Sequence, residues 1–267
     1  MTDRNPQAQQ MADESMVRNL AAQAEAIWPQ EEPLVRAYGE RTAILDVGCG
    51  TGEISSRLAA LWPAAHVTGV DLIEAHLALA RARYASVGER LKFARGDAFE
   101  LPFAAGSFDL VVCRHLLQAV PMPERVIAEL VRVARPGGVI HLVVEDYDMI
   151  HAAPSELDIA TFWHVGPRVF GGATGTDLFI GRNAHHHLRR LPVDDIRIDY
   201  AIVDTQRVPR ETIAQIFTAW RDGYSEALAG YLGWPLADIC AHFDATIECA
   251  RTGFAVWFVP IVSARVR

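Results

Sequence analysis

Residues 44–52 read Ile-Leu-Asp-Val-Gly-Cys-Gly-Thr-Gly, and this stretch decides the fold. Its first four residues suit a buried strand, and Gly48, Gly50 and Gly52 follow at intervals of two. A helical segment is predicted to begin near Glu53. A strand that breaks into glycines before a helix exposes bare backbone, with amide N–H groups that point toward a ligand. We therefore expect a nucleotide-like cofactor to lie against this turn.

The spacing of the glycines indicates which cofactor this is. A dinucleotide-binding turn follows the pattern G-x-G-x-x-G, whose last glycine lets the helix pack close beneath a pyrophosphate. Glu53 holds the place of that last glycine, and its carboxylate near a helix start would repel a pyrophosphate. The pattern Asp46-x-Gly48-x-Gly50-x-Gly52 instead resembles the first motif of class I S-adenosylmethionine (SAM) dependent methyltransferases. SAM carries no phosphate, and its ammonium makes a nearby acid such as Asp46 tolerable.

Length, charge and composition bound the class of protein. The 267 residues are enough for one large domain, or for a domain with a cap, around a substantial core. The net charge of -8 argues against a protein that follows nucleic-acid phosphates, which would need a basic face. No apolar run approaches the ~20 residues that span a bilayer, and no signal peptide is expected. The four cysteines show no metal-binding spacing, so we expect a reduced, cytoplasmic protein.

Short β-rich runs alternate with amphipathic helical patterns along the first half of the chain. Such alternation predicts a parallel sheet that helices cover on both faces. The predicted strands lie near residues 43–48, 66–71, 91–96, 108–113 and 138–145. The predicted helices lie near residues 53–62, 74–87 and 122–134.

The remaining segments are assigned in the same way. Apolar residues at helical spacing predict a helix from Ser15 to Trp28 that Pro29 ends, and a second short helix covers residues 32–38. Residues 148–181 are rich in proline, glycine and aromatic residues, and are interpreted as an irregular insertion. The other predicted elements are a helix near 178–190, a strand at 195–204, two helices within 210–250 and a strand at 253–266.

The resemblance implies an α/β fold, with a Rossmann-like seven-stranded sheet and helices on both faces. In that fold the last two strands form a hairpin and the final strand is antiparallel. A helical insert at 210–250 would split the hairpin here, and a small helical cap is expected. We predict four parts: an N-terminal helical cap segment at 1–40, a SAM-binding core at 41–147, a lid or insertion at 148–181, and the C-terminal part of the core at 182–267.

Candidate binding residues follow the second and third strands. Asp71 ends the second strand and Leu72 follows it, and both are candidate cofactor contacts. An acid at residue 71 can accept hydrogen bonds from both ribose hydroxyls. Asp71 could instead cap the next helix, and the two roles can coexist. After the third strand, the resemblance implies that Asp97 accepts a hydrogen bond from the adenine amine. It also implies that Ala98 offers its backbone N–H and that Phe99 supports the base.

Residues 101–115 indicate which group of methyltransferases the chain resembles. They read Leu-Pro-Phe-Ala-Ala-Gly-Ser-Phe-Asp-Leu-Val-Val-Cys-Arg-His. This is similar to the L-P-F-x-x-x-x-F-D-x-V segment of the ubiquinone/menaquinone-biosynthesis-type methyltransferases, a group with many small-molecule substrates. Residues 129–138 also fit that group, and the resemblance covers about residues 40–147.

The fourth strand ends in two candidate site residues, Arg114 and His115. The ends of such strands face the crevice where ligands bind, and the resemblance implies contact with the methionine part of SAM. His115 could take a proton from a substrate hydroxyl or amine, or it could only pack or hydrogen-bond the cofactor. Arg114 could pair the cofactor carboxylate, or contribute only its backbone.

The fifth strand ends in Glu145-Asp146-Tyr147-Asp148. Three carboxylates beside a crevice could hold a cationic substrate or take a proton, or they could be solvated turn residues. Glu145 and Tyr147 join His115 as the candidate catalytic residues.

Two further patterns receive an interpretation. Trp163, His164 and the glycine-rich residues 166–175 could form a lid, because long loops of this kind often close over ligands. The run His185-His186-His187 does not predict a metal site, because consecutive side chains on a helix point about 100° apart and cannot converge on one ion.

These motifs predict an enzyme that transfers a methyl group from SAM to a small molecule. Three alternatives remain: attack on another carbon of SAM, including ring closure of its aminobutyrate arm, a non-catalytic SAM-binding module, and an NAD-dependent oxidoreductase. No nucleic acid or membrane partner is expected. A homodimer is left open, and the acceptor is not identified.

Overall fold

The computed structural model describes residues 4–267, apart from the side chains of residues 8 and 9. Across these residues one mixed sheet of eight strands has the order β3-β2-β1-β4-β5-β8-β6, and β7 pairs with the other side of β8. The parallel strands are β1 (Ala43–Val47), β2 (His66–Asp71), β3 (Leu91–Arg95), β4 (Phe108–Arg114) and β5 (Ala134–Val143). Each of them overlaps a predicted strand, so the predicted parallel sheet is confirmed.

The last two long strands form the split hairpin that was predicted. β7 (Val193–Asp204) and β8 (Phe254–Val266) pair in antiparallel fashion, and α8 (Arg210–Leu232) and α9 (Leu236–Thr252) interrupt their connection. The second half of β8 also pairs with β5, which makes it the antiparallel strand beside the parallel set. The first half pairs with β6 (Ile150–Ala153), an additional strand that the sequence pattern did not predict.

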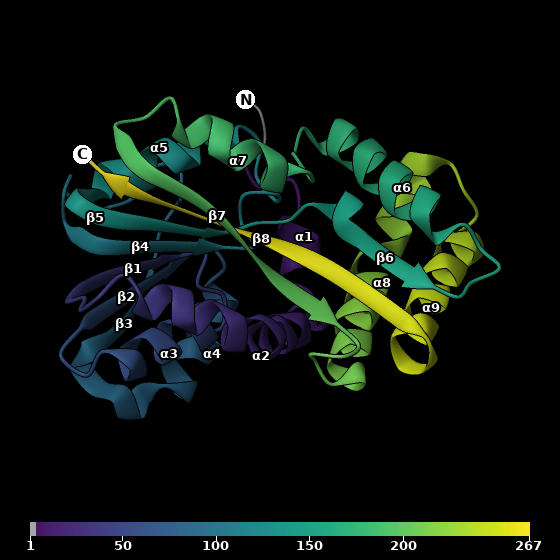
Figure 1. Cartoon of the computed structure of the whole chain (residues 1–267), viewed down its shortest axis with the longest axis horizontal. Coiled ribbons are helices and arrows are strands. Elements are labelled where there is room, and N and C mark those ends of the chain that lie inside the picture. The colour runs from purple at the N-terminus through teal and green to yellow at the C-terminus, as the bar shows by residue number, and fades with distance from the viewer. Residues whose placement is uncertain (1–3) are drawn as a thin grey trace.

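Alternate residues of the central strands enter two different buried clusters. Leu45 and Val111 pack on one face, while Ile44 and Leu110 pack on the other. Successive strand residues point to opposite faces, so a strand buried on both faces must be continuously apolar. In Figure 1, α5 and α7 lie over one face, and α2, α3 and α4 lie over the other.

The helices that surround the core begin and end within a few residues of the predicted bounds. The helices are α1 (Ala8–Met11), α2 (Glu14–Arg36), α3 (Glu53–Leu61), α4 (Glu74–Arg83), α5 (Pro123–Val133) and α7 (Ile180–Leu188). Two short 3-10 helices, η1 (Ala85–Arg90) and η2 (Tyr147–Met149), complete them. The predicted helix at 74–87 therefore ends earlier and continues as η1.

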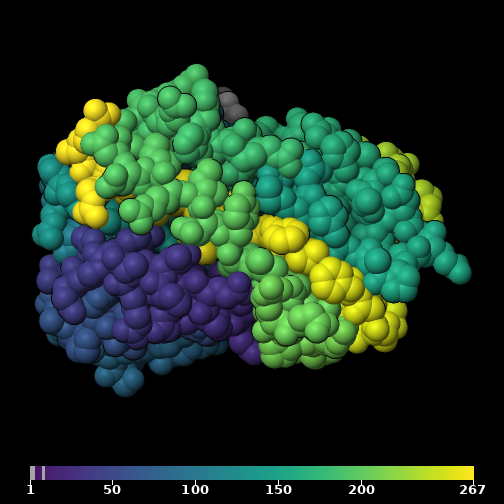
Figure 2. Space-filling model, in the orientation of Figure 1, coloured from purple at the N-terminus to yellow at the C-terminus, as the bar shows by residue number. Residues whose placement is uncertain are grey.

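The prediction of two N-terminal helices separated by Pro29 is wrong. One helix, α2, continues through Pro29 and Pro33. Each proline removes one backbone donor, but the contacts of the helix offset that loss. The side chain of Gln30 exchanges two hydrogen bonds of 2.9 and 3.0 Å with the backbone of Ile202 in β7. In Figure 2 the purple N-terminal part meets the light green α8, against which α2 packs.

The interpretation of residues 148–181 as irregular is also wrong. Besides η2 and β6, they contain α6 (Ile159–Thr174), which spans most of the glycine-rich stretch. The carboxylate of Asp158 caps the helix by accepting from the backbone N–H of Thr161 at 2.9 Å. Burial of an aromatic face stabilises this helix, and intrinsic propensity does not report such burial.

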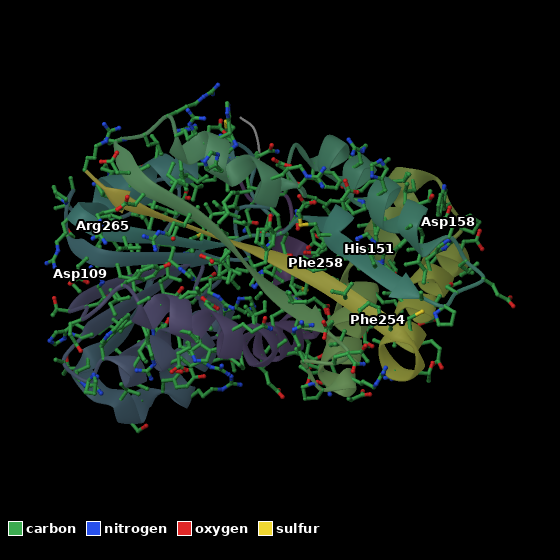
Figure 3. The ribbon with its side chains drawn as sticks, viewed as in Figure 1. Asp109, His151, Asp158, Phe254, Phe258 and Arg265 are labelled. Atoms are coloured by element: carbon green, nitrogen blue, oxygen red, sulfur yellow. The ribbon has the colours of Figure 1, made fainter. Side chains whose placement is uncertain are left out.

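The helices α6, α8 and α9 form the cap, beside β6 and the first half of β8 (Figure 1). Figure 3 shows Phe254 at the cap end of β8, Phe258 farther along it and Arg265 at the sheet end. Part of α2 joins the cap core. The large buried rings of that core are Phe162, Trp163, Phe170, Phe217, Trp220, Phe243 and Trp257. No helix within residues 4–267 is long and apolar enough to cross a membrane.

A buried charge network attaches α2 to the sheet. Glu31 is fully buried, and its carboxylate lies 2.9 Å from the guanidinium of Arg114 and 3.0 Å from Nε2 of His141. The hydroxyl of Tyr38 lies 2.8 Å from Nδ1 of the same histidine. Burial raises the pKa of Glu31, but Arg114 and His141 lower it by more, so the pKa lies below its usual value. The network therefore stabilises the fold while Glu31 is ionised.

Replacing Glu31 by glutamine should lower the free energy of unfolding by about 3 kcal/mol at pH 7, because it leaves the buried guanidinium of Arg114 without its counter-charge. The folded-state pKa of Glu31 is depressed, so its contribution is full above about pH 4.5 and disappears as pH falls through the folded value. Urea unfolding of the wild type and of Glu31→Gln at pH 7 and at lower pH measures this. The exposed Glu25→Gln on the same helix is the control. Equal stability of Glu31→Gln and wild type at pH 7 would contradict the role of the network.

Candidate functional site

The carboxyl ends of four parallel strands and the N-terminal segment surround one cavity of about 800 Å³, counted out to its open mouth. The parallel register pairs Val47 with Val70 and with Cys113, so the segments that follow β1, β2 and β4 meet at one edge. Nine predicted site residues line this cavity: Gly48, Gly50, Asp71, Leu72, Asp97, Ala98, Phe99, Arg114 and His115. Of the remaining predictions, Asp46, Gly52, Glu145 and Tyr147 lie elsewhere.

The glycine turn has the geometry that its sequence predicts. Gly48, Gly50 and Gly52 have φ angles of 74°, 53° and 86°, in the left-handed region that favours glycine. The backbone N–H of Gly50 donates to the carboxylate of Asp71 at 2.8 Å. Gly52 lies away from the cavity, where an added Cβ would come within 2.7 Å of the ring of Phe93. A glycine at this position therefore lets the turn pack closely against the sheet.

Asp71 holds two segments of the cavity edge together. One of its oxygens accepts from Gly50, and the other accepts from the backbone N–H of Ile73 at 2.9 Å, just before α4. This second bond closes a turn ahead of α4, but Asp71 does not cap the helix: the N-cap residue is Ile73, and no side chain caps it. A carboxylate offers about four acceptor positions, so two of them remain for hydroxyl donors in the cavity that Asp71 lines.

Asp46 faces a second, smaller recess behind Gly48, of about 350 Å³, which shares Arg114 and His115 with the main cavity. Its carboxylate is buried and accepts a hydrogen bond of 2.6 Å from Ser55. Burial raises the pKa of Asp46 to about 6, and the Ser55 hydrogen bond opposes that shift. A cation in the recess would find an acid that is half ionised in mildly acidic solution.

The predicted adenine site carries an unexpected arginine. Asp97 accepts from the backbone N–H of Phe99 at 2.9 Å, and its other oxygen lies 3.1 Å from the guanidinium of Arg4. Arg4 also lies over the Phe99 ring, 5.5 Å from its centre. Nothing in the sequence pattern signals this contact, because it joins residues far apart in the chain. The N-terminal segment thus covers this end of the cavity.

His115, in the wall of the cavity, forms a buried pair with Glu145, which does not itself line the cavity. Nδ1 of His115 lies 2.7 Å from a carboxylate oxygen of Glu145. His115 has a φ angle of 52°, a conformation that is uncommon for residues other than glycine. Its Nε2 atom is buried and has no hydrogen-bond partner within the described residues. If the Nδ1 proton is directed at Glu145, Nε2 keeps a lone pair that can accept a proton.

Arg114 does not extend freely into the cavity. Its guanidinium lies 2.9 Å from the carboxylate of Glu31, although it also forms part of the cavity wall. Glu31 belongs to a helix that is distant in the sequence, so no motif marked it. Any anion that Arg114 binds would share the arginine with Glu31.

The other acids after β5 are engaged in ion pairs. Asp146 accepts two hydrogen bonds of 2.5 and 2.6 Å from Arg182, and Asp148 pairs with His164 at 2.7 Å and with Arg182. Of the three carboxylates, only Glu145 contacts a residue of the cavity wall. Tyr147 lines a different pocket in the cap.

The run His185–His187 lies in α7. Among the described residues, no three His, Cys, Asp or Glu side chains are grouped so that they could hold a metal ion.

Comparisons with known proteins support the interpretation of the core. A family model described as a methyltransferase domain matches residues 45–142, less than half of the chain. The ubiquinone biosynthesis O-methyltransferase of Aromatoleum aromaticum is 40% identical over 96 residues, which make up 36% of this chain and 40% of that protein. The chain thus spans about two fifths of the length of this curated relative.

Solved structures share the fold over most of the chain. Phosphoethanolamine N-methyltransferase 2 of Haemonchus contortus, solved with phosphomonomethylethanolamine and S-adenosylhomocysteine, matches with a TM-score of 0.59 and 18% identity, over 92% of this chain and 56% of that one. The [4+2]-cyclase SpnF matches with a TM-score of 0.55 and 21% identity, over 89% of this chain and 80% of that one. At these identities the likeness shows the fold alone. Residues 45–142 are therefore a methyltransferase domain, and the chain has the fold of the class I SAM-dependent methyltransferases.

Proposed function

We propose that this protein transfers a methyl group from SAM to a small-molecule acceptor. One observation carries the proposal: nine residues selected from the sequence as SAM contacts line a single cavity around the left-handed glycine turn. The matched methyltransferase domain lies at the same place in the chain. Cytoplasmic location and the absence of a nucleic-acid partner stay predictions from composition, and a homodimer stays open.

The chemistry of the cavity fits SAM. The backbone of Gly48 and Gly50 lies at the cavity wall, where a Cβ on either would be 3.2 Å or less from a neighbouring leucine. Asp71 retains acceptor capacity for ribose hydroxyls, and Asp46 supplies a negative charge for an ammonium group. Glu53, by contrast, begins α3 and pairs with Arg83. This carboxylate at a helix start disfavours a dinucleotide pyrophosphate.

In this proposal SAM supplies an activated methyl group on its sulfonium. The protein has to align an acceptor with that methyl and keep water away from the cavity. An acceptor hydroxyl or amine forms the new bond to the methyl carbon as the carbon–sulfur bond breaks, and the electron pair of that bond goes to sulfur. Nε2 of His115 takes the proton that the acceptor loses, while Glu145 orients the imidazole.

Calorimetry with S-adenosylhomocysteine and turnover assays with SAM test the proposal. The protein should bind S-adenosylhomocysteine, and it should release that product from SAM only when an acceptor is present. Release of methylthioadenosine from SAM alone would instead indicate chemistry on the aminobutyrate arm. Tight binding without turnover over a broad acceptor panel would indicate a binding module, and no binding at high micromolar concentrations would overturn the proposal.

Replacing Asp71 by alanine should weaken S-adenosylhomocysteine binding by at least roughly thirtyfold, about 2 kcal/mol, because two hydrogen bonds to a charged acceptor are lost. Calorimetry measures the affinity, and thermal unfolding shows whether the fold survives loss of the Gly50 contact. Asp194→Ala, an exposed site on β7, should leave the affinity unchanged. Unchanged affinity in a folded Asp71→Ala protein would mean that the ribose lies elsewhere.

The affinity for S-adenosylhomocysteine should rise between pH 5 and pH 7. Asp46 has a pKa of about 6, and only its ionised form, which prevails above that pH, attracts the ligand ammonium. The ammonium and carboxylate of the ligand do not titrate in this range. Calorimetry across the range should give a pH-dependent affinity for wild type and a nearly flat one for Asp46→Asn. A slope that persists in Asp46→Asn would assign the effect to another group.

With any acceptor that the wild type methylates, His115→Ala should lower kcat by roughly 10²–10⁴-fold, the usual contribution of a general base. Glu145 is a positioning residue, so Glu145→Gln, which keeps a hydrogen-bond acceptor, should retain more activity than Glu145→Ala. Affinity for S-adenosylhomocysteine should change little in the two Glu145 variants, because Glu145 does not line the cofactor cavity. Wild-type kcat in His115→Ala would show that the acceptor needs no base.

A further inference from the structure

A second pocket, in the cap, has no role in the cofactor site. It lies among α6, α8, α9 and the segment after β5, and its empty volume is about 490 Å³. Its walls are mostly aromatic. The rings of Tyr147 and Trp163 are stacked, with centres 6.2 Å apart and planes 5° apart, and Trp220 meets both rings edge-on at 5.4 and 5.9 Å. Such a wall is suited to flat or apolar ligands.

This pocket adjoins the cofactor cavity. Met11 lines the cofactor cavity, and its sulfur lies 3.6 Å from the hydroxyl of Tyr224, which lines the cap pocket. Gln7 also lines the cap pocket, and it donates to the backbone carbonyl of Gln118, next to the cavity-lining residue Ala119. The N-terminal segment therefore contributes to the walls of both spaces, with Gln7 lining the cap pocket and Met11 lining the cofactor cavity.

The cap pocket also lies close to the buried His115–Glu145 pair. The rings of His115 and Trp257 are 6.0 Å apart, and Trp257 contacts the pocket residue Trp220 at 5.2 Å. The Glu145 carboxylate is near enough to act on both pocket tyrosines, since burial and then its charge raise the pKa values of Tyr147 and Tyr224. The wall of the cap pocket is therefore connected to His115 through Trp220 and Trp257.

The lining of the pocket restricts the charge of its occupant. Within the described chain, no side chain that lines it carries a formal charge, and its polar side-chain groups are the amide of Gln7, two tyrosine hydroxyls and two indole N–H groups. An ionised phosphate, carboxylate or ammonium would lose its hydration there without a counter-ion, which is costly. A neutral molecule with a planar ring would gain aromatic contacts and could satisfy one or two polar atoms.

We propose that the cap pocket is the acceptor site, and that it selects a neutral, largely apolar molecule with a planar ring. This inference rests on the proposed methyl transfer, and it adds the location and the class of the acceptor. The pocket is built mainly from elements outside residues 45–142, so this chain's own cap determines the selectivity.

Gly166 of α6 offers a direct test, because it lines the pocket and a Cβ there would meet only Leu228, at 3.7 Å. A leucine at this position can therefore be accommodated at its Cβ and would fill the pocket with the rest of its side chain. Gly172, on the same helix, is exposed and has nothing within 4 Å of an added Cβ. Gly172→Leu is the control on the same helix, and thermal unfolding of both variants is compared as well, because Gly166 precedes Pro167 and a Cβ there strains the helix.

The probe is 2-naphthol, and its binding is measured by calorimetry with and without S-adenosylhomocysteine. Wild type and Gly172→Leu should bind 2-naphthol equally, Gly166→Leu at least tenfold more weakly, and all three should bind S-adenosylhomocysteine equally. The charged analogues 2-naphthyl phosphate and trimethylanilinium should bind at least tenfold more weakly than 2-naphthol.

Three results would overturn the inference. Equal 2-naphthol affinity in Gly166→Leu would place the acceptor elsewhere, and preference for either charged analogue would refute the neutral class. Absence of 2-naphthol binding to wild type would also count against the pocket. Failure of S-adenosylhomocysteine to bind any variant would instead refute the proposed methyl transfer, so the two failures are distinguishable.

Discussion

The hydrogen bond from the Gly50 backbone to the Asp71 carboxylate is the contact on which the site depends. It joins the turn after β1 to the end of β2, and it forms only because the parallel register places those two ends side by side. The left-handed glycines keep this turn free of side chains. A nucleoside can lie against this open backbone, and its ribose hydroxyls can donate hydrogen bonds to the adjacent carboxylate. The geometry of the turn after β1 therefore links the fold to the proposed cofactor.

Near this turn, two consecutive residues make buried polar contacts with different roles: one stabilises the fold, and the other belongs to the proposed catalytic site. Arg114 pairs with Glu31 and so attaches α2 to the sheet, while the next residue, His115, pairs with Glu145 and presents an unpartnered nitrogen. Two neighbouring residues at the end of β4 thus serve two purposes. A shift of α2 would therefore move Arg114 and so alter the wall of the cofactor cavity.

The cap is stabilised by a different type of interaction. Its helices and the first half of β8 are held by aromatic packing rather than by charge, and the same rings form the second pocket. The N-terminal segment lies between this apolar space and the polar cavity, with Gln7 and Met11 contacting both sides. The acceptor and the cofactor of the proposed reaction would therefore meet where this segment borders both spaces.

The sequence by itself determined the core strands and the glycine turn, because strand burial and left-handed turns impose strong local patterns such as the glycines after Val47. The split hairpin followed from the resemblance to the methyltransferases. The sequence did not determine the continuity of α2 through Pro29, the helical state of α6 or the strand β6, since packing against distant elements decides these. The roles of Glu31 and Arg4 and the existence of the cap pocket could not be predicted from the sequence either, because each depends on contacts between segments far apart in the chain. Motifs made of neighbouring residues can be recognised in the sequence, whereas contacts between residues far apart in the chain form only when the protein folds.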